Sequence, residues 1–167
     1  MKPLIVVSSK TGNTRIIARA LQDGIGECAY VEAKHMPRDL TNYNPIVLCF
    51  WCDRGMAPED IQAAATVIKH KDVACFATMG GNPESNKAKD WMRRTSKALT
   101  EAGEDNCLCL EFLCRGRIDP ELFARMTAMM GGEASPERET RRRESETHPD
   151  RLDALAAVKI YRETFKQ

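Results

Sequence analysis

Leu4-Ile5-Val6-Val7-Ser8-Ser9-Lys10-Thr11-Gly12-Asn13-Thr14 is the stretch of sequence that decides the fold. Its four leading apolar residues are typical of a strand that is buried on both faces, as in a parallel sheet covered by helices. A loop rich in hydroxyl side chains follows at once, and a helix is expected to begin near Asn13. A strand, a short loop and a helix in this order predict the first part of a β-α-β unit.

Four further apolar segments repeat the strand pattern along the chain. The five strands are expected at residues 4–8, 29–33, 46–51, 73–78 and 108–114. Stretches of helical periodicity separate them, such as the one in which Ile61, Ala64, Ala65 and Ile68 share a face. The alternation predicts an α/β fold, a doubly wound, five-stranded parallel sheet with helices on both faces. With 167 residues, the chain is expected to form one domain, 1–167.

Charge and apolar content argue against several functional classes. Lys and Arg number 25 and Asp and Glu number 24, so there is no basic excess of the kind that attracts nucleic acid. No apolar run reaches the roughly 18 residues that a membrane span needs, and no signal peptide precedes the first strand. A cytoplasmic location without a membrane partner is therefore expected. The seven cysteines lie mostly in strand-like segments, so they are expected to be reduced, with no disulfides.

The loop after the first strand has the composition of a phosphate site. The first turn of the following helix supplies unpaired N–H groups and the positive end of the helix dipole. Gly12 lets the backbone approach an anion closely, and Asn13 tolerates an unusual turn conformation. The glycine patterns of triphosphate and dinucleotide loops are absent. The sequence thus predicts a phosphate monoester held by Ser9, Lys10, Thr11, Gly12, Asn13 and Thr14.

These residues resemble the phosphate loop of the flavodoxin family, which reads approximately [ST]-x-T-G-N-T. Residues 114–119 and 147–150 also look like segments of small flavodoxin-domain proteins. The resemblance implies the strand order 2-1-3-4-5 and FMN as the cofactor. It also implies electron transfer to a redox protein partner, either a reductase or a terminal enzyme. Asp150 or Thr147 is expected to cap the last helix.

Contacts with the flavin ring are expected from the loops after the third and fourth strands, because ligands of such sheets bind beyond the carboxyl ends of the strands. Trp51 either stacks on the ring or simply ends a core strand. The resemblance implies that the peptide of Gly55 reorients when the flavin is reduced. Gly80 and Gly81 would let backbone N–H groups reach the polar edge of the ring. The predicted ring contacts are Trp51, Cys52, Asp53, Arg54, Gly55, Met79, Gly80, Gly81 and Asn82.

Two departures from the carrier flavodoxins keep other functions open. Residues 79–86 hold no aromatic side chain to cover the second face of the ring, and the chain lacks a strong acidic excess. An uncovered ring face suits an NAD(P)H-dependent FMN oxidoreductase that acts on quinone-like acceptors. A flavin-free binding module of the same fold is a third hypothesis. Electron transfer is favoured, and no catalytic residue is assigned.

The cysteines and the C-terminal third are interpreted as structural. Cys49 and Cys52 have C-x-x-C spacing, but Cys49 falls within a strand rather than at a helix N-terminus. Cys107 and Cys109 share a strand face, yet no further Cys or His motif completes a metal site, so no metal is expected. A helical stripe of apolar residues is predicted to fill the core, and residues 131–147 are predicted to form an exposed charged loop. The stripe consists of Leu122, Phe123, Met126, Met129 and Met130.

Overall fold

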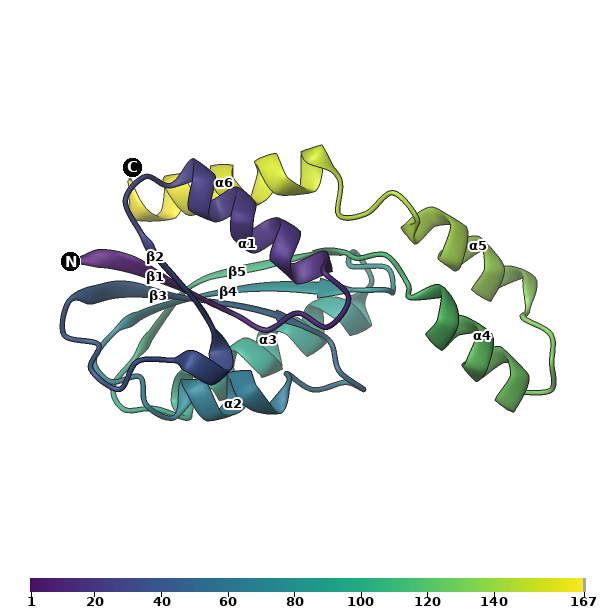
Figure 1. Ribbon diagram of the computed structural model, residues 1–167, viewed down its shortest axis with the longest axis horizontal. Coiled ribbons are helices and arrows are strands. Elements are labelled where there is room, and N and C mark those ends of the chain that lie inside the picture. Colours follow the sequence, from purple (N-terminus) through teal and green to yellow (C-terminus); the bar gives the residue numbers. More distant parts are fainter. Residues whose placement is uncertain (167) are drawn as a thin grey trace.

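The computed structural model, which describes residues 1–166, shows a five-stranded parallel sheet between two helical layers (Figure 1). The strands lie in the order β2-β1-β3-β4-β5, and every neighbouring pair is parallel. The predicted fold class and strand order are therefore confirmed. The strands are β1 (Lys2–Val7), β2 (Ala29–Glu32), β3 (Tyr43–Trp51), β4 (Asp72–Met79) and β5 (Cys107–Arg115).

Helices cover both faces of the sheet. On one face α1 (Asn13–Gly24) packs against α6 (Arg151–Phe165). On the other lie the short 3₁₀ turn η1 (Ala33–His35), α2 (Glu59–Ala65) and α3 (Asn86–Glu101). Asp150 caps α6 by accepting hydrogen bonds from the backbone N–H groups of residues 152 and 153, as predicted. Within residues 1–166, no helix is both long and apolar enough to cross a bilayer.

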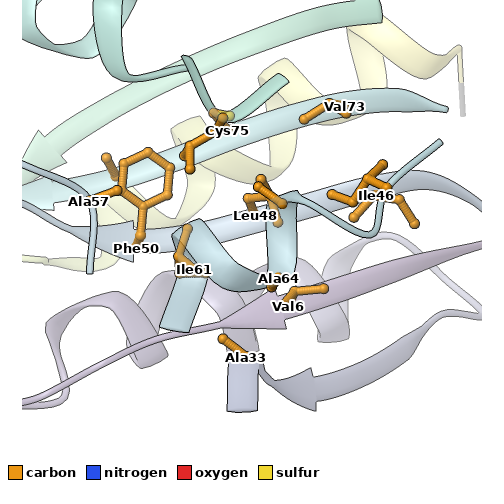
Figure 2. Close-up of a cluster of buried hydrophobic side chains, with 14 of the residues drawn as sticks. Val6, Ala33, Ile46, Leu48, Phe50, Ala57, Ile61, Ala64, Val73 and Cys75 are labelled. Atoms are coloured by element: carbon orange, nitrogen blue, oxygen red, sulfur yellow. The ribbon is translucent and has the colours of Figure 1, made fainter. Parts of the chain in front are cut away.

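Successive residues of the central strands point alternately into two separate hydrophobic cores, one on each face of the sheet. Leu48 and Phe50 of β3 face α2 and α3, where they meet Ile61 (Figure 2). Val47 and Cys49 point the opposite way, toward α1 and α6. This alternation follows from the two-residue period of a strand. Both faces being covered explains why the strands read as continuous apolar runs, and it leaves the ends of the strands as the place for a polar site.

The predicted apolar stripe after β5 does not join either core. It lies on α4 (Pro120–Met129), which pairs with α5 (Pro136–Ser145) in a helical hairpin that projects beyond the sheet (Figure 1). Of the described residues of α4 none is buried, and the exposed fractions are 48% for Met126 and 87% for Met129. The prediction that the methionines fill the core is wrong. The helical period revealed an apolar face, but within residues 1–166 neither core of the sheet includes it.

The segment predicted as an exposed charged loop at 131–147 is also corrected, because most of it forms α5. Ser135 caps this helix by accepting a hydrogen bond from the N–H of Arg138. Glu139 pairs with Arg142 at 2.7 Å and with Arg143 at 3.2 Å, three and four residues along the helix. The mixed charges therefore stabilise a helix instead of a solvated loop. Phe123 of α4 lies under the guanidinium groups of two arginines of α5, which holds the hairpin together.

Replacing Met126 or Met129 with serine is expected to change the free energy of unfolding by less than about 0.5 kcal/mol, because neither side chain is packed. The comparison variant is Ile61→Ala, whose side chain is fully buried against β3. That substitution is expected to cost about 2–5 kcal/mol. Urea unfolding of the three variants measures the difference. A loss at Met126 as large as that at Ile61 would show that the hairpin closes over a core.

Candidate functional site

The loop between β1 and α1 leaves a series of backbone N–H groups unpaired. Among the described residues, the N–H groups of residues 10–14 donate to no other group. Gly12 has φ +99° and ψ −15°, a left-handed conformation that L side chains rarely adopt, and a Cβ at this position would project into open space. Helix α1 begins at Asn13, as predicted. The loop therefore aims free donors and the positive end of a helix at one point.

Lys10 supplies the positive charge nearest to these donors in sequence. Its side chain is exposed and forms no ion pair with any residue in the described part of the chain. The ammonium group lies 5.8 Å from the centre of the Trp51 ring, so the end of β3 and the loop after β1 meet. A cation without a carboxylate partner beside free N–H groups suits a phosphate group.

Three contacts that the sequence did not reveal hold the loop in shape. The side-chain oxygen of Ser9 accepts a hydrogen bond from the N–H of Arg15 at 3.3 Å. The side-chain amide of Asn13 donates to the carbonyl of Arg117 at 2.9 Å, across 104 positions of sequence. Gly116 makes that approach possible, since a Cβ there would lie 2.8 Å from the Asn13 amide nitrogen. The loop is thus fixed to the end of β5 as well as to α1.

Thr14 is buried, and its hydroxyl is already engaged. Its Oγ1 lies 2.9 Å from Oγ1 of Thr78, at the carboxyl end of β4, and both side chains are almost fully buried. The hydroxyl of Thr14 therefore ties α1 to β4. What Thr14 offers an anion in this geometry is its backbone N–H group.

Replacing Thr14 with valine is expected to lower the free energy of unfolding by about 1–3 kcal/mol, because the buried Thr78 hydroxyl would lose its partner. Thr78→Val is the matched reciprocal change. The double variant is expected to be close to the wild-type protein, since valine keeps the shape of threonine and no hydroxyl is left unpaired. Urea unfolding of all four proteins tests this cycle. Additive losses in the double variant would show that the two hydroxyls act independently.

The loop after β3 is a tight turn that α3 supports from behind. Asp53 and Met56 exchange two backbone hydrogen bonds of 2.9 Å, and between them Arg54 (φ +49°) and Gly55 (φ +81°) both take left-handed conformations. This is the pattern of a type I′ turn. The indole N–H of Trp91 in α3 donates to the carbonyl of Gly55 at 3.0 Å. That carbonyl is therefore directed toward α3.

A polar cleft of about 630 Å³ joins the loops after β1 and β3. Its lining includes two ion pairs: Arg15 lies 3.2 Å from Glu32, which raises the pKa of the guanidinium, and Arg54 lies 3.4 Å from Asp53. The cleft thus brings together residues predicted for the phosphate and residues predicted for the ring. Among them are Ser9, Lys10, Trp51, Asp53 and Arg54.

The loop after β4 is shaped by local packing and by its own hydrogen bonds. Gly80 packs closely, because a Cβ there would lie 2.8 Å from the side chain of Ile118. The side-chain oxygen of Asn82 accepts from the N–H of Glu84, which shapes the turn before α3. Gly81 faces open space. Neither these residues nor Met79 line the polar cleft, so the structure leaves their contact with a ring as a prediction.

A second cavity, of about 490 Å³, lies behind the loop after β3. Gly55, Met56 and Trp91 line it together with other side chains of α2 and α3. The turn at residues 53–56 therefore separates two cavities, one polar and one largely apolar. Trp91 contacts the turn from the apolar side, and Lys10 and Trp51 lie on the polar side. The turn is therefore held by a contact from α3 as well as by its own two backbone hydrogen bonds.

Cys49 and Cys52 do not form a reactive pair. Cys49 is fully buried in the core under α1, whereas Cys52 packs against the core on the other face of the sheet. Burial raises the pKa of both thiols. A thiolate is disfavoured at each position, so the spacing reflects packing in and after a strand.

The donor set of the loop after β1 fits a phosphate monoester. The loop holds free N–H groups, a lysine without an ion pair in the described residues, an exposed threonine and a glycine beside open space. The adjoining polar cleft has a volume of about 630 Å³, and Trp51 forms part of its wall.

Comparison with known proteins identifies the family and the fold. The family model for the flavodoxin domain matches residues 4–162. The flavodoxin-like domain-containing protein BilS of Clostridioides difficile (strain CD3) is 29% identical over 167 aligned residues, which cover 94% of this chain and 92% of BilS. Oxidised flavodoxin 1 from Bacillus cereus matches with a TM-score of 0.59 and 16% identity, covering 100% and 99% of the two chains. General stress protein 14 from Treponema denticola, in complex with FMN, matches with a TM-score of 0.53 and 11% sequence identity. The match covers 96% of this chain and 99% of that protein.

Proposed function

Because the chain belongs to the flavodoxin domain family, we propose that it binds FMN and carries electrons to a partner oxidoreductase. The observation that carries the proposal is the loop at residues 9–14, whose free N–H groups and Gly12 leave room for one phosphate group. FMN ends in a phosphate monoester, whereas FAD and NAD carry a pyrophosphate. The complex of general stress protein 14 with FMN supports this choice, since that protein shares the fold.

The residues of this chain bind and orient the cofactor. The Thr11 hydroxyl donates a hydrogen bond to the phosphate, and Lys10 adds a positive charge. Trp51 offers its ring face, and the turn at Asp53–Met56 sets the distance between the ring and α3. When bound, FMN supplies one- and two-electron chemistry, which the protein tunes by position and electrostatics. A reductase or terminal enzyme docks near the exposed edge of the ring.

Purified protein titrated with FMN tests the proposal. The flavin fluorescence is expected to be quenched with a one-to-one endpoint, and the visible flavin bands are expected to shift. FAD at the same concentrations is expected to bind much more weakly, because its pyrophosphate exceeds the loop. Inorganic phosphate is expected to compete with FMN. A protein that neither contains nor takes up FMN would refute the proposal and would favour a flavin-free binding module.

The open side of the loop after β4 favours a second candidate function. Gly81 faces open space, and no aromatic residue occurs within residues 79–86. A ring face left accessible in this way suits hydride transfer from NAD(P)H and reduction of a quinone-like acceptor. The second candidate is therefore an NAD(P)H-dependent FMN oxidoreductase.

Rapid mixing of the FMN-loaded protein with NADH or NADPH separates the two functions. An electron carrier is expected to keep its oxidised flavin spectrum until a reductase is added. An oxidoreductase is expected to lose the visible flavin bands within the first turnover and to recover them when a quinone is supplied. Direct bleaching without a reductase would replace the carrier function with the second candidate.

A further inference from the structure

Two thiols and a carboxylate meet at the end of the sheet opposite the phosphate loop. Asp72 begins β4 and Cys107 begins β5, and the two residues are paired across the strands. Cys109 lies two positions further along β5, which is an edge strand. The ligand atoms of Asp72, Cys107 and Cys109 all lie within 4.8 Å of one another. This cluster lies where β4 and β5 begin, whereas the loops of the candidate flavin site follow the carboxyl ends of the strands.

A bulge in β5 brings the third side chain into the group. Val73 pairs with Leu108, but the next residue, Ala74, pairs with Leu110, so Cys109 has no partner on β4. Its Sγ lies 3.6 Å from Oδ1 of Asp72. Such a bulge locally re-aims a side chain. Here it directs the Cys109 thiol toward the carboxylate.

Asn44 of β3 fixes the orientation of that carboxylate. Its side-chain amide donates to Oδ2 of Asp72 at 2.8 Å, and its side-chain oxygen accepts from the N–H of Asp72 at 2.9 Å. Oδ2 is thus occupied, while Oδ1 faces the thiol. Metal-binding carboxylates are commonly oriented by an outer hydrogen bond of this kind.

We propose that Asp72, Cys107 and Cys109 bind a zinc-class divalent cation, which links the edge strand β5 to β4. The spacing of the donors supports this. Bonds of about 2.3 Å to sulfur and about 2.0–2.2 Å to oxygen, at a tetrahedral angle, place sulfur and oxygen about 3.5 Å apart. The Cys109–Asp72 distance of 3.6 Å agrees with that value. Binding displaces two thiol protons into solvent, and the fourth coordination position is left to water.

Two thiol side chains distinguish this cluster. The two other carboxylate-rich clusters in the described residues contain no thiol. His70, Glu104 and Asp105 are exposed, and His148, Asp150 and Asp153 are occupied in capping α6. The thiols single out the cluster at Asp72.

Cobalt(II) titration of the reduced, metal-free protein tests the site. Thiolate ligands are expected to give a near-ultraviolet charge-transfer band that saturates at one equivalent of Co²⁺ and disappears when Zn²⁺ is added. Cys107→Ser and Cys109→Ser are expected to abolish the band, and Asp72→Asn to weaken binding by about 10- to 100-fold. Cys28→Ser is the matched control, because this half-buried cysteine lies outside the cluster and should leave the band unchanged.

Thermal unfolding with and without zinc distinguishes loss of metal binding from misfolding of a variant. Zinc is expected to raise the Tm of the wild-type and Cys28→Ser proteins by several degrees and to leave Cys107→Ser and Cys109→Ser unchanged, provided the metal-free variants unfold cooperatively. A wild-type protein without a thiolate band, or a band that persists when both Cys107 and Cys109 are serine, would overturn the proposal. The result is independent of FMN, because the same titration applies to the flavin-free and flavin-loaded protein.

Discussion

Replacing Thr11 with alanine is expected to raise the dissociation constant for FMN by about 10- to 100-fold while leaving the free energy of unfolding unchanged. The Thr11 hydroxyl is exposed, and its contact in the structure is an acceptor contact of 3.4 Å from the Asn13 amide. Its proton is therefore available to a phosphate oxygen. A hydrogen bond to a charged group contributes about 1.5–3 kcal/mol, and each 1.4 kcal/mol is about tenfold in affinity. Fluorescence titration with FMN measures the change.

Two further variants show whether Thr11 acts directly. Thr41→Ala removes an exposed threonine hydroxyl that is bonded to Asp39, far from the loop in sequence, and should leave FMN affinity unchanged. Asn13→Ala is expected to weaken FMN binding and also to lower stability, because the carbonyl of Arg117 would lose its donor. Unchanged affinity in both Thr11→Ala and Asn13→Ala would refute the assignment of the phosphate loop.

The two tryptophans of the chain are expected to give opposite results. Trp91→Ala is expected to lower the free energy of unfolding by about 3–5 kcal/mol, because the indole is 7% exposed and packs edge-on against Phe50. Trp51→Ala is expected to cost much less stability, since this ring is only half-buried at the end of β3, and instead to weaken FMN binding. Urea unfolding and FMN titration of both variants make the comparison.

Trp91→Phe separates packing from hydrogen bonding at the same position. Phenylalanine keeps an aromatic ring against Phe50 but cannot donate to the carbonyl of Gly55. Stability is expected to fall far less than in Trp91→Ala, whereas the midpoint potentials of bound FMN are expected to shift as the turn at residues 53–56 loses its support. Potentials identical to those of the wild-type protein would show that the Gly55 carbonyl is held by its own turn alone.

The sheet and the phosphate loop were predictable because their signals are local. Each strand is a short apolar run, and the loop at residues 9–14 needs only a strand before it and a helix after it. The observed β3 begins at Tyr43, before the predicted start at Ile46. Tyr43 pairs with Lys2 of β1, but the polar Asn44 and then Pro45 separate it from the apolar run, so hydrophobicity did not mark this start. The predicted start of α1 needed no tertiary contact and is confirmed.

The rest of the site depends on contacts between distant segments. Asn13 reaches Arg117 across 104 positions, and Trp91 reaches Gly55 across 36. The local sequence around Asn13 or Trp91 does not indicate which distant residue each side chain contacts. The prediction for the C-terminal hairpin is wrong for a different reason. Helical periodicity reports that α4 has an apolar face, but whether that face is covered depends on where the chain places the next helix.

The projecting hairpin of α4 and α5 is connected to the phosphate loop, yet it is expected to have a stability of its own. Because no side chain of the described α4 is buried, the hairpin is expected to open and reclose without melting the sheet, and its amides to exchange hydrogen faster than those of β3. Its base meets the loop through the Asn13–Arg117 hydrogen bond. The binding of a ligand that orders the loop is thus thermodynamically linked to closure of the hairpin. Slower amide hydrogen exchange in α4 and α5 would therefore report that the loop is occupied, although the ligand does not touch these helices.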